Sequence, residues 1–184
     1  MISMQKKEAR IKAKIIRAKE KNNLNAFQII EHIPASIFNN RIIAGYWPLT
    51  DELDIIPLLK SCFSKGHKLS LPCTPERGNP LLFRSWSPTD KLKKGLYGTC
   101  EPFPEKALVV PNLILLPLLA FTGTGTRLGY GGGYYDRTLA SLRLRNDIFA
   151  CGIAFASQEV DFLPTDEFDQ NLDGILTDKY FKAF

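Results

Sequence analysis

A run of charged, aromatic and glycine residues has the composition of a ligand-binding loop. It reads Arg127-Leu-Gly-Tyr-Gly-Gly-Gly-Tyr-Tyr-Asp-Arg137. Glycine costs backbone entropy wherever it is fixed, so a cluster marks a chain that bends sharply or approaches another molecule closely. An apolar stretch of strand length, 112–117, precedes the loop, and leucines at near-helical spacing follow it in 134–144. A strand, a glycine loop and a helix together present N–H groups and a positive helix end to a phosphate, so we expect a phosphate site.

The loop does not match the common nucleotide-binding fingerprints. A G-x-G-x-x-G pattern fails whether it is read from Gly123 or from Gly129, and no Gly-Lys-Ser/Thr follows the glycines. The alternative interpretation is a glycine-rich turn shaped only for tight packing. The charges of Arg127, Asp136 and Arg137 bracket the glycines and favour the phosphate hypothesis.

These residues carry a family resemblance. Leu116-Pro-Leu-Leu-Ala-Phe121, followed by the run from Gly125 to Arg137, resembles the signature of the 5-formyltetrahydrofolate cyclo-ligases, also called methenyltetrahydrofolate synthetases. The resemblance extends along the chain to a basic N-terminal helix, the Glu52 region and a closing segment, 163–177. It implies ATP- and Mg2+-dependent cyclisation of 5-formyltetrahydrofolate to 5,10-methenyltetrahydrofolate, through an imidate phosphate, with release of ADP and phosphate, in folate one-carbon metabolism. Two positions depart: Thr122 stands where many members have Asp, and Phe168 where many have His.

The resemblance also implies site residues in several segments. In the family a Lys-x-x-x-Arg pair on the first helix contacts ATP, and Lys6 and Arg10 match it. Arg127 is the predicted catalytic residue, acting on the γ-phosphate. ATP contacts are predicted at Lys6, Lys7, Arg10, Arg127, Leu128, Gly129, Tyr130, Gly131, Gly132, Gly133, Tyr134 and Tyr135. Folate contacts are predicted at Trp47, Glu52, Tyr130, Gly131, Gly132, Gly133 and Tyr134, and Mg2+ ligands at Asp136 and Asp169.

The chemistry of these side chains suits the implied roles. Lys6 and Arg10 are one helical turn apart, so both can point at a single anion; the alternative is a merely solvated basic face. Magnesium takes oxygen ligands, commonly one or two carboxylates with phosphate and water. Asp136 follows the loop directly and can equally favour the helix dipole, whereas Asp169 lies in a stretch crowded with other acids. A carboxylate such as Glu52 can accept the adjacent N–H donors of a pterin ring as a fork.

Composition limits the class of protein. The chain has 184 residues, 45% hydrophobic and 23% charged, as expected for one soluble domain, 1–184, onto which a basic helix at 1–21 packs. Four dispersed cysteines without a C-x-x-C pair, and two histidines far from any cysteine pair, argue against zinc. No apolar run is long enough to cross a bilayer, and the N-terminus lacks a signal core, so a cytoplasmic protein is expected. We expect a monomer with 5-formyltetrahydrofolate and ATP as partners, and with neither nucleic acid nor membrane.

The positive charge is concentrated at the N-terminus. Residues 1–21 hold eight Lys and Arg against two Glu, whereas the remainder holds 16 basic and 17 acidic residues. This leaves a first rival hypothesis, a nucleic-acid-binding module that uses the basic helix, although no RNA- or DNA-binding motif is present. Further rivals are a catalytically altered paralogue, supported by the Thr122 and Phe168 departures, and an ATP-dependent enzyme acting on another amide-like substrate.

The elements that position these residues alternate between helix and strand. Met4 to Lys21 is predicted to be a helix, with an apolar stripe (Ile11, Ile15, Ala18) beside a basic one (Lys6, Arg10, Lys14, Arg17). Further helices are expected over Asn25–Phe38, interrupted near Pro34, from an N-cap at Thr50 to about Ser64, and over Tyr134–Leu144. Strands are expected at 41–47, 67–72, 81–86, 113–116, 148–155 and 174–177. This order predicts a Rossmann-like α/β fold, a three-layer αβα domain with a mainly parallel central sheet.

Overall fold

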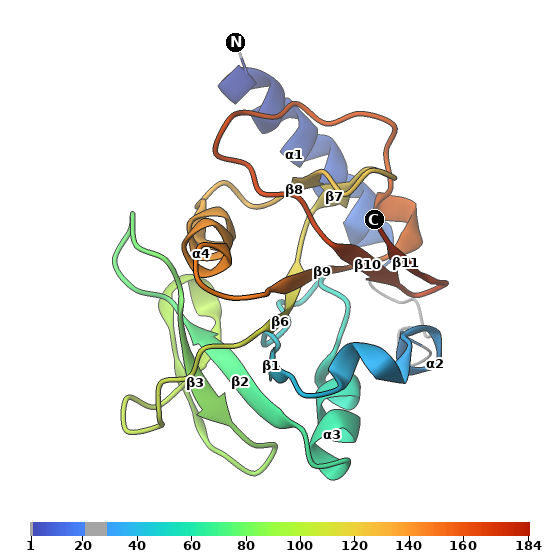
Figure 1. Cartoon of the computed structure of the whole chain (residues 1–184). Helices are drawn as coiled ribbons and strands as arrows, with labels where there is room; N and C mark the ends of the chain where they lie inside the picture. Colours follow the sequence, from blue (N-terminus) through green and yellow to red (C-terminus); the bar gives the residue numbers. More distant parts are fainter. Residues whose placement is uncertain (1, 21–28) are drawn as a thin grey trace.

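A seven-stranded sheet forms the centre of the computed structural model, which describes residues 2–20 and 29–184 (Figure 1). Its strand order is β11-β10-β9-β6-β1-β2-β3. The five inner strands run parallel, and β3 and β11 pair antiparallel at the two edges. The strands are β1 (Ile42–Ala44), β2 (Lys68–Cys73), β3 (Leu82–Trp86), β6 (Leu113–Pro117), β9 (Phe149–Ala154), β10 (Gly174–Thr177) and β11 (Phe181–Ala183). The predicted mainly parallel α/β sheet is therefore confirmed.

Helices cover both faces of this sheet. Successive side chains of a strand point to opposite faces, so β6 sends Leu113 and Leu115 into one core and Ile114 and Leu116 into the other. The first core is closed by α2 (Ile29–His32), the 3-10 turn Ala35–Phe38 and α3 (Ile56–Ser64). The second is closed by α4 (Tyr134–Arg143), whose Leu139 is fully buried. Figure 1 shows α3 and α4 on opposite sides of the sheet.

Helix α1 (Ile2–Lys19) lies outside these layers, across a small hairpin of β7 (Ala120–Phe121) and β8 (Arg127–Leu128). A third core joins them, formed by Ala13, Leu119, Ala120, Leu128 and Leu163. Within the described residues, no helix has both the length and the apolar character needed to cross a bilayer.

The orientation of α1 is the reverse of what its apolar stripe indicates. Ile11 and Ile15 are more than half exposed, whereas Lys6 and Arg17 are 8% and 3% exposed. An amphipathic helix normally buries its apolar face. Here the buried face carries Ala13 between two long cations, and carboxylates from distant segments compensate their charge.

One predicted helix is wrong in position, and one predicted connection is wrong. The helix expected from Thr50 begins at Ile56, because Pro57 has no N–H to bond a preceding turn and is tolerated only in the first turn. The strand ending at Pro117 does not lead directly into the glycine loop, because the β7–β8 hairpin intervenes.

Other predictions differ only in extent. The helix expected over Asn25–Phe38 is shorter, a four-residue helix and a 3-10 turn on either side of Pro34, and its first residues lie outside the described part of the chain. The hairpin of β4 (Leu92–Lys94) and β5 (Cys100–Pro102) and the edge strand β11 were not predicted. Strands this short carry too little alternation to register in a sequence pattern.

Candidate active site

Several of the predicted site residues lie on the chain segments that follow β1 and β6. Strand β1 pairs with β2 on one side and with β6 on the other, so the chain order reverses between β1 and β6. Such a switch point leaves a crevice in which open α/β sheets bind ligands. The connection after β1 supplies Asp51 and Glu52, and the chain after β6 leads through the β7–β8 hairpin to the glycine loop.

One group of charges, the phosphate-side cluster, joins α1 to the glycine loop and the C-terminal segment. It consists of Lys6, Arg10, Arg127, Asp136, Asp166 and Asp169. The Nζ atom of Lys6 lies 2.7 Å from Asp166 Oδ2 and 2.6 Å from Asp169 Oδ2. The Nε atom of Arg10 donates to the carbonyl of Gly129 at 2.9 Å. Residues some 120 to 160 positions apart thus meet around the loop.

Arg127, like Lys6, is a buried cation of this cluster. Its Nη2 donates to Asp136 Oδ1 at 2.6 Å, and its Nη1 is buried with no hydrogen-bond partner among the described residues. Burial lowers the pKa of the guanidinium, although Asp136 and Asp169 act in the opposite direction. A buried donor without a partner is costly, so an anion that reached Nη1 would satisfy a group that the protein leaves unbonded.

The two predicted metal ligands fit a magnesium ion held together with phosphate oxygens. Asp136 Oδ1 also accepts the backbone N–H of Gln170 at 3.2 Å, and Gln170 follows Asp169 in the chain, so both carboxylates lie beside Arg127. Two carboxylates with phosphate and water are the donors that magnesium commonly takes. Both are held by cations here, and no group of three or more potential metal ligands occurs among the described residues.

A second group, the Glu52 cluster, lies at the other end of α1 and consists of Arg17, Asp51, Glu52 and Tyr130. Arg17 Nη2 donates to Asp51 Oδ2 at 2.7 Å, and its Nη1 donates to the Tyr130 hydroxyl oxygen. The Tyr130 hydroxyl donates in turn to Glu52 Oε1. Arg17 Nη1 also lies 3.8 Å from Glu52 Oε1, and its guanidinium stacks over the Tyr130 ring at 5.1 Å.

Glu52 is a buried carboxylate with acceptor capacity to spare. Only 4% of its side chain is exposed, and burial raises its pKa, against the lowering effects of the Leu49 amide, Tyr130 and Arg17. Its Oε2 accepts the Leu49 N–H at 2.8 Å and its Oε1 accepts from Tyr130. A carboxylate offers about four lone-pair positions, so each oxygen keeps one for a ligand N–H.

The glycine loop takes a conformation that requires glycine at two positions. Gly131 has φ of +99° and Gly133, the N-cap of α4, has φ of +66°. A Cβ on Gly131 would lie 3.1 Å from the Arg10 guanidinium carbon, and one on Gly133 would lie 2.6 Å from Arg137 Nη1. The loop is therefore shaped to let two arginines approach its backbone, in line with the prediction of a loop that approaches other groups closely.

The remaining predicted residues are placed less directly. Lys7 is exposed on the outer side of α1 and does not join either cluster, and the Leu128 side chain packs in the core beneath α1. Trp47 lies edge-on to Trp86 at 6.4 Å, which leaves its predicted folate contact untested. Tyr134 donates to the Pro75 carbonyl at 3.3 Å. Tyr135 is half-buried, and burial raises its pKa.

Three residues of the two clusters were not singled out from the sequence as site residues: Arg17, Asp51 and Asp166. Arg17 follows Lys6 by eleven positions, which is about three helical turns, so the spacing alone places both on one face of α1. The acids that pair with them come from distant segments, and no local pattern marks them.

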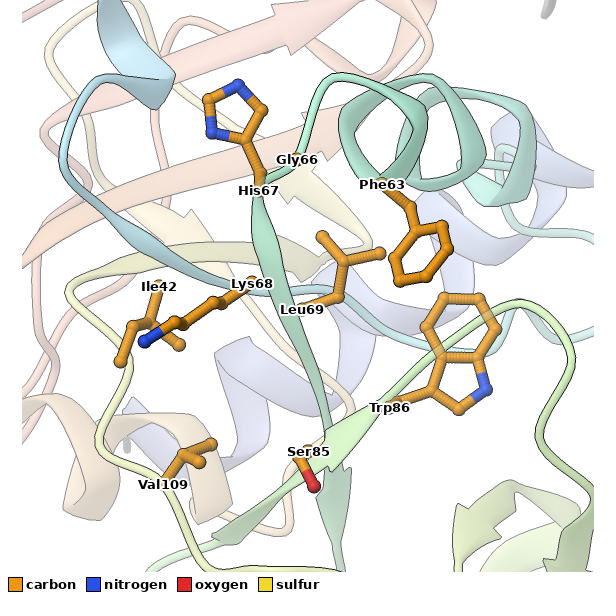
Figure 2. A pocket seen from close by; sticks show the side chains of 9 residues that line it. All are labelled: Ile42, Phe63, Gly66, His67, Lys68, Leu69, Ser85, Trp86 and Val109. Carbon is orange, nitrogen blue, oxygen red and sulfur yellow. The ribbon is translucent and has the colours of Figure 1, made fainter.

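A hollow of about 410 Å³ lies elsewhere, at the amino ends of β1 and β2 (Figure 2). Ile42 and Lys68 begin these strands, and Phe63, Leu69, Trp86 and Val109 make the lining mainly apolar. Its ionisable residues are His67 and Lys68, and none of the predicted site residues reaches it. We therefore place the candidate active site at the opposite, carboxyl edge of the sheet.

Comparison with known proteins identifies the family of this chain. Residues 4–178 match the model of the 5-formyltetrahydrofolate cyclo-ligase family. The chain is 34% identical to a 5-formyltetrahydrofolate cyclo-ligase of Haemophilus influenzae over 139 residues, covering 73% of this chain and 74% of the relative. It is 26% identical to the mouse enzyme of that name over 184 residues, covering 88% and 91%. The NMR structure of Aquifex aeolicus 5,10-methenyltetrahydrofolate synthetase has a TM-score of 0.75 at 30% identity, covering 97% of this chain and 92% of that one.

Proposed function

Since this chain belongs to the 5-formyltetrahydrofolate cyclo-ligase family, we propose that it converts 5-formyltetrahydrofolate to 5,10-methenyltetrahydrofolate, and that the reaction requires ATP and Mg2+ and releases ADP and phosphate. The observation that carries the proposal is the cluster of Lys6, Arg10 and Arg127 around the glycine loop and the C-terminal acids, in which a buried Arg127 nitrogen has no hydrogen-bond partner among the described residues.

The phosphate-side cluster is the proposed nucleotide site. Loop amides and the amino end of α4 offer hydrogen bonds to phosphate oxygens, and Arg127 adds a charge-assisted contact to the group that transfers. Lys6 is held by Asp166 and Asp169 in the described structure, so an incoming phosphate would compete with these carboxylates for it. Asp136 and Asp169 would hold Mg2+, which supplies positive charge that neutralises the phosphate oxygens.

The Glu52 cluster is the proposed folate site. Glu52 keeps one acceptor position on each oxygen, which matches two adjacent N–H donors on a pterin ring. Tyr130 belongs to the glycine loop and donates to Glu52, so it links the folate site to the nucleotide site. Trp47 and Tyr134 remain proposed aromatic contacts.

The proposed reaction needs alignment more than a protein nucleophile. The formamide oxygen of the substrate attacks the γ-phosphorus of ATP, ADP leaves, and the oxygen becomes part of an imidate phosphate. The N10 amine then attacks the imidate carbon, N10 loses its proton, and phosphate departs as the ring closes. Holding both substrates between the two clusters, and neutralising charge with Arg127, are the contributions that this chain can make.

The test is the absorbance of the methenyl product. Purified protein is mixed with 5-formyltetrahydrofolate, Mg2+ and ATP, and a matched reaction omits ATP. Growth of the methenyl band only in the presence of ATP is the expected result. A flat trace from folded protein that binds ATP would reject the proposal and favour the altered paralogue or another amide-like substrate.

A nucleic-acid-binding role receives less support. Three cations of the basic helix, Lys6, Arg10 and Arg17, bond groups within the protein rather than forming one solvated basic face. Strongly salt-dependent binding to RNA without binding of ATP analogues would revive it.

A further inference from the structure

Arg17 is a buried cation that the proposed reaction does not use. It lies in the last turns of α1, is 3% exposed, and belongs to the Glu52 cluster rather than to the phosphate-side cluster. Arginine is rarely buried unless it is paired, so the hydrogen-bond partners of a buried arginine indicate its role. Here the partners are Asp51, Tyr130 and the carbonyl of Leu118.

The two edges of the Arg17 guanidinium bond different groups. Nε and Nη2 both donate to Asp51 Oδ2, at 3.2 and 2.7 Å, which fixes the plane of the group. Nη1 is then directed at the Tyr130 hydroxyl oxygen. Because that oxygen accepts from Arg17, its proton is directed to Glu52, whose Oε1 accepts it. Asp51, Arg17, Tyr130 and Glu52 thus form one chain of hydrogen bonds.

We propose that Arg17 is a positioning residue for folate recognition, which acts through the Tyr130 hydroxyl to hold the Glu52 carboxylate in place and ionised. This inference rests on the proposed function, because it assigns Arg17 to the proposed folate site. A carboxylate buried as deeply as Glu52 favours its neutral form unless a cation or donors oppose this. A protonated Glu52 would present a donor where the pterin also presents donors, so the charge of Arg17 preserves the match.

The other groups around Glu52 do not supply this charge. The Leu49 amide and the Tyr130 hydroxyl also lower the pKa of Glu52, but both are neutral donors, and the charge of Asp51 acts in the opposite direction. Among the described residues, the titratable and charged groups that face Glu52 are Arg17, Tyr130, Asp51, Tyr46 and Tyr135. Arg17 is the only cation in this set.

The experiment compares Arg17→Gln with Arg17→Lys and with Lys14→Gln, which removes an exposed charge from the same helix. The ionisation of Glu52 is followed by carbon NMR of the carboxyl group in the ligand-free protein, with Glu52→Gln to assign the signal. Affinity for 5-formyltetrahydrofolate and for an ATP analogue is measured separately across neutral and acidic pH.

For Arg17→Gln we expect the Glu52 midpoint to move to higher pH by about one unit, which corresponds to about a tenfold change in the equilibrium. Folate affinity should fall about tenfold and should weaken further as the pH falls, because the carboxylate protonates earlier. ATP affinity should stay within about twofold. Arg17→Lys should restore the midpoint, and Lys14→Gln should change none of these.

Two results would overturn the inference. One is an unchanged Glu52 midpoint in Arg17→Gln, and this holds whether or not the wild-type protein forms the methenyl product. The other is an equal loss of folate and ATP affinity, which a purely structural loosening of α1 would give, since Lys6 and Arg10 lie on the same helix. If Arg17→Gln does not fold, Tyr130→Phe removes the bridging hydroxyl from a residue that is 40% exposed and must move the Glu52 midpoint to higher pH in the same way.

Discussion

The two ends of α1 carry cations that are held in different ways. Lys6 pairs with Asp166 and Asp169, whose side chains are 39% and 22% exposed. Arg17 pairs with Asp51, whose side chain is 34% exposed, and with Tyr130, which itself bonds Glu52, whose side chain is 4% exposed. Carboxylates near solvent can be exchanged for an incoming anion at small cost, whereas the bonds of the buried Glu52 carboxylate must persist because water cannot replace them.

Because of this difference, the two ends of α1 suit different kinds of ligand. In the phosphate-side cluster, partly exposed carboxylates pair with Lys6, and one Arg127 nitrogen has no hydrogen-bond partner among the described residues. The Glu52 cluster satisfies its cation within the protein and keeps acceptor capacity instead. The first arrangement suits a phosphate that arrives and departs, and the second suits recognition of a neutral ring by its N–H groups.

The largest expected effect is a loss of turnover when the phosphate-side cluster is altered. Arg127→Ala should lower kcat by at least about 1,000-fold, because it removes the buried charge next to the transferring phosphate. The absorbance of the methenyl product measures this, and Arg145→Ala, at an exposed arginine just beyond the end of α4, is the matched control. Near-normal turnover of Arg127→Ala would remove Arg127 from the mechanism, and an altered Glu52 titration would mean that the two clusters are not independent.

A smaller effect separates the two ends of the helix. Lys6→Gln should raise the KM for ATP by about 10- to 100-fold, as expected for the loss of a charged hydrogen bond, and should leave folate affinity unchanged. Lys12→Gln removes an exposed charge from the same helix and should have little effect. Equal losses for both substrates would show that Lys6 acts by holding α1 in place.

The shape of the glycine loop offers a further test. Gly131→Ala should weaken ATP-analogue binding by about 3- to 10-fold, because φ of +99° strains any other residue and the new Cβ would crowd Arg10. Gly129→Ala is the control, since a Cβ there meets no atom within 4 Å in the described structure. Equal effects would show that the loop is disturbed by any added side chain rather than through Arg10.

The smallest expected effect is the stability contribution of an ion pair outside both clusters. Lys106 lowers the pKa of Asp90, so the pair stabilises the fold above the ordinary aspartate pKa and loses this contribution as the pH falls through the lower, folded value. Asp90→Asn should therefore reduce the free energy of unfolding by less than about 1 kcal/mol at neutral pH, and by nothing once the pH is well below 4. Urea unfolding at both pH values measures this. A loss that grows toward low pH would contradict the assignment.

Much of the fold follows from local patterns in the sequence. Apolar runs such as 113–116 and 174–177 are long enough to register as buried strands, and the glycine run with its flanking charges marks the loop without any knowledge of the fold. The predicted start of α3 is wrong, because the N-cap signal at Thr50 favours an early start whereas Pro57 must lie in the first turn and the helix begins at Ile56. Short strands such as β7 and β8 exist only because they pair with each other beneath α1.

By itself, the sequence determined the glycine loop, the parallel strands and the chemistry available at Lys6, Arg10, Arg127 and Glu52, because these depend on residue type and short-range spacing. Only the tertiary structure decided which face of α1 is buried. Its pattern favours burial of Ile11 and Ile15, yet Lys6 and Arg17 are the residues inside. The physical reason is that a buried charge is tolerated only beside a compensating one. The compensating carboxylates, Asp169 and Asp51, come from segments that only the folded chain brings to the helix.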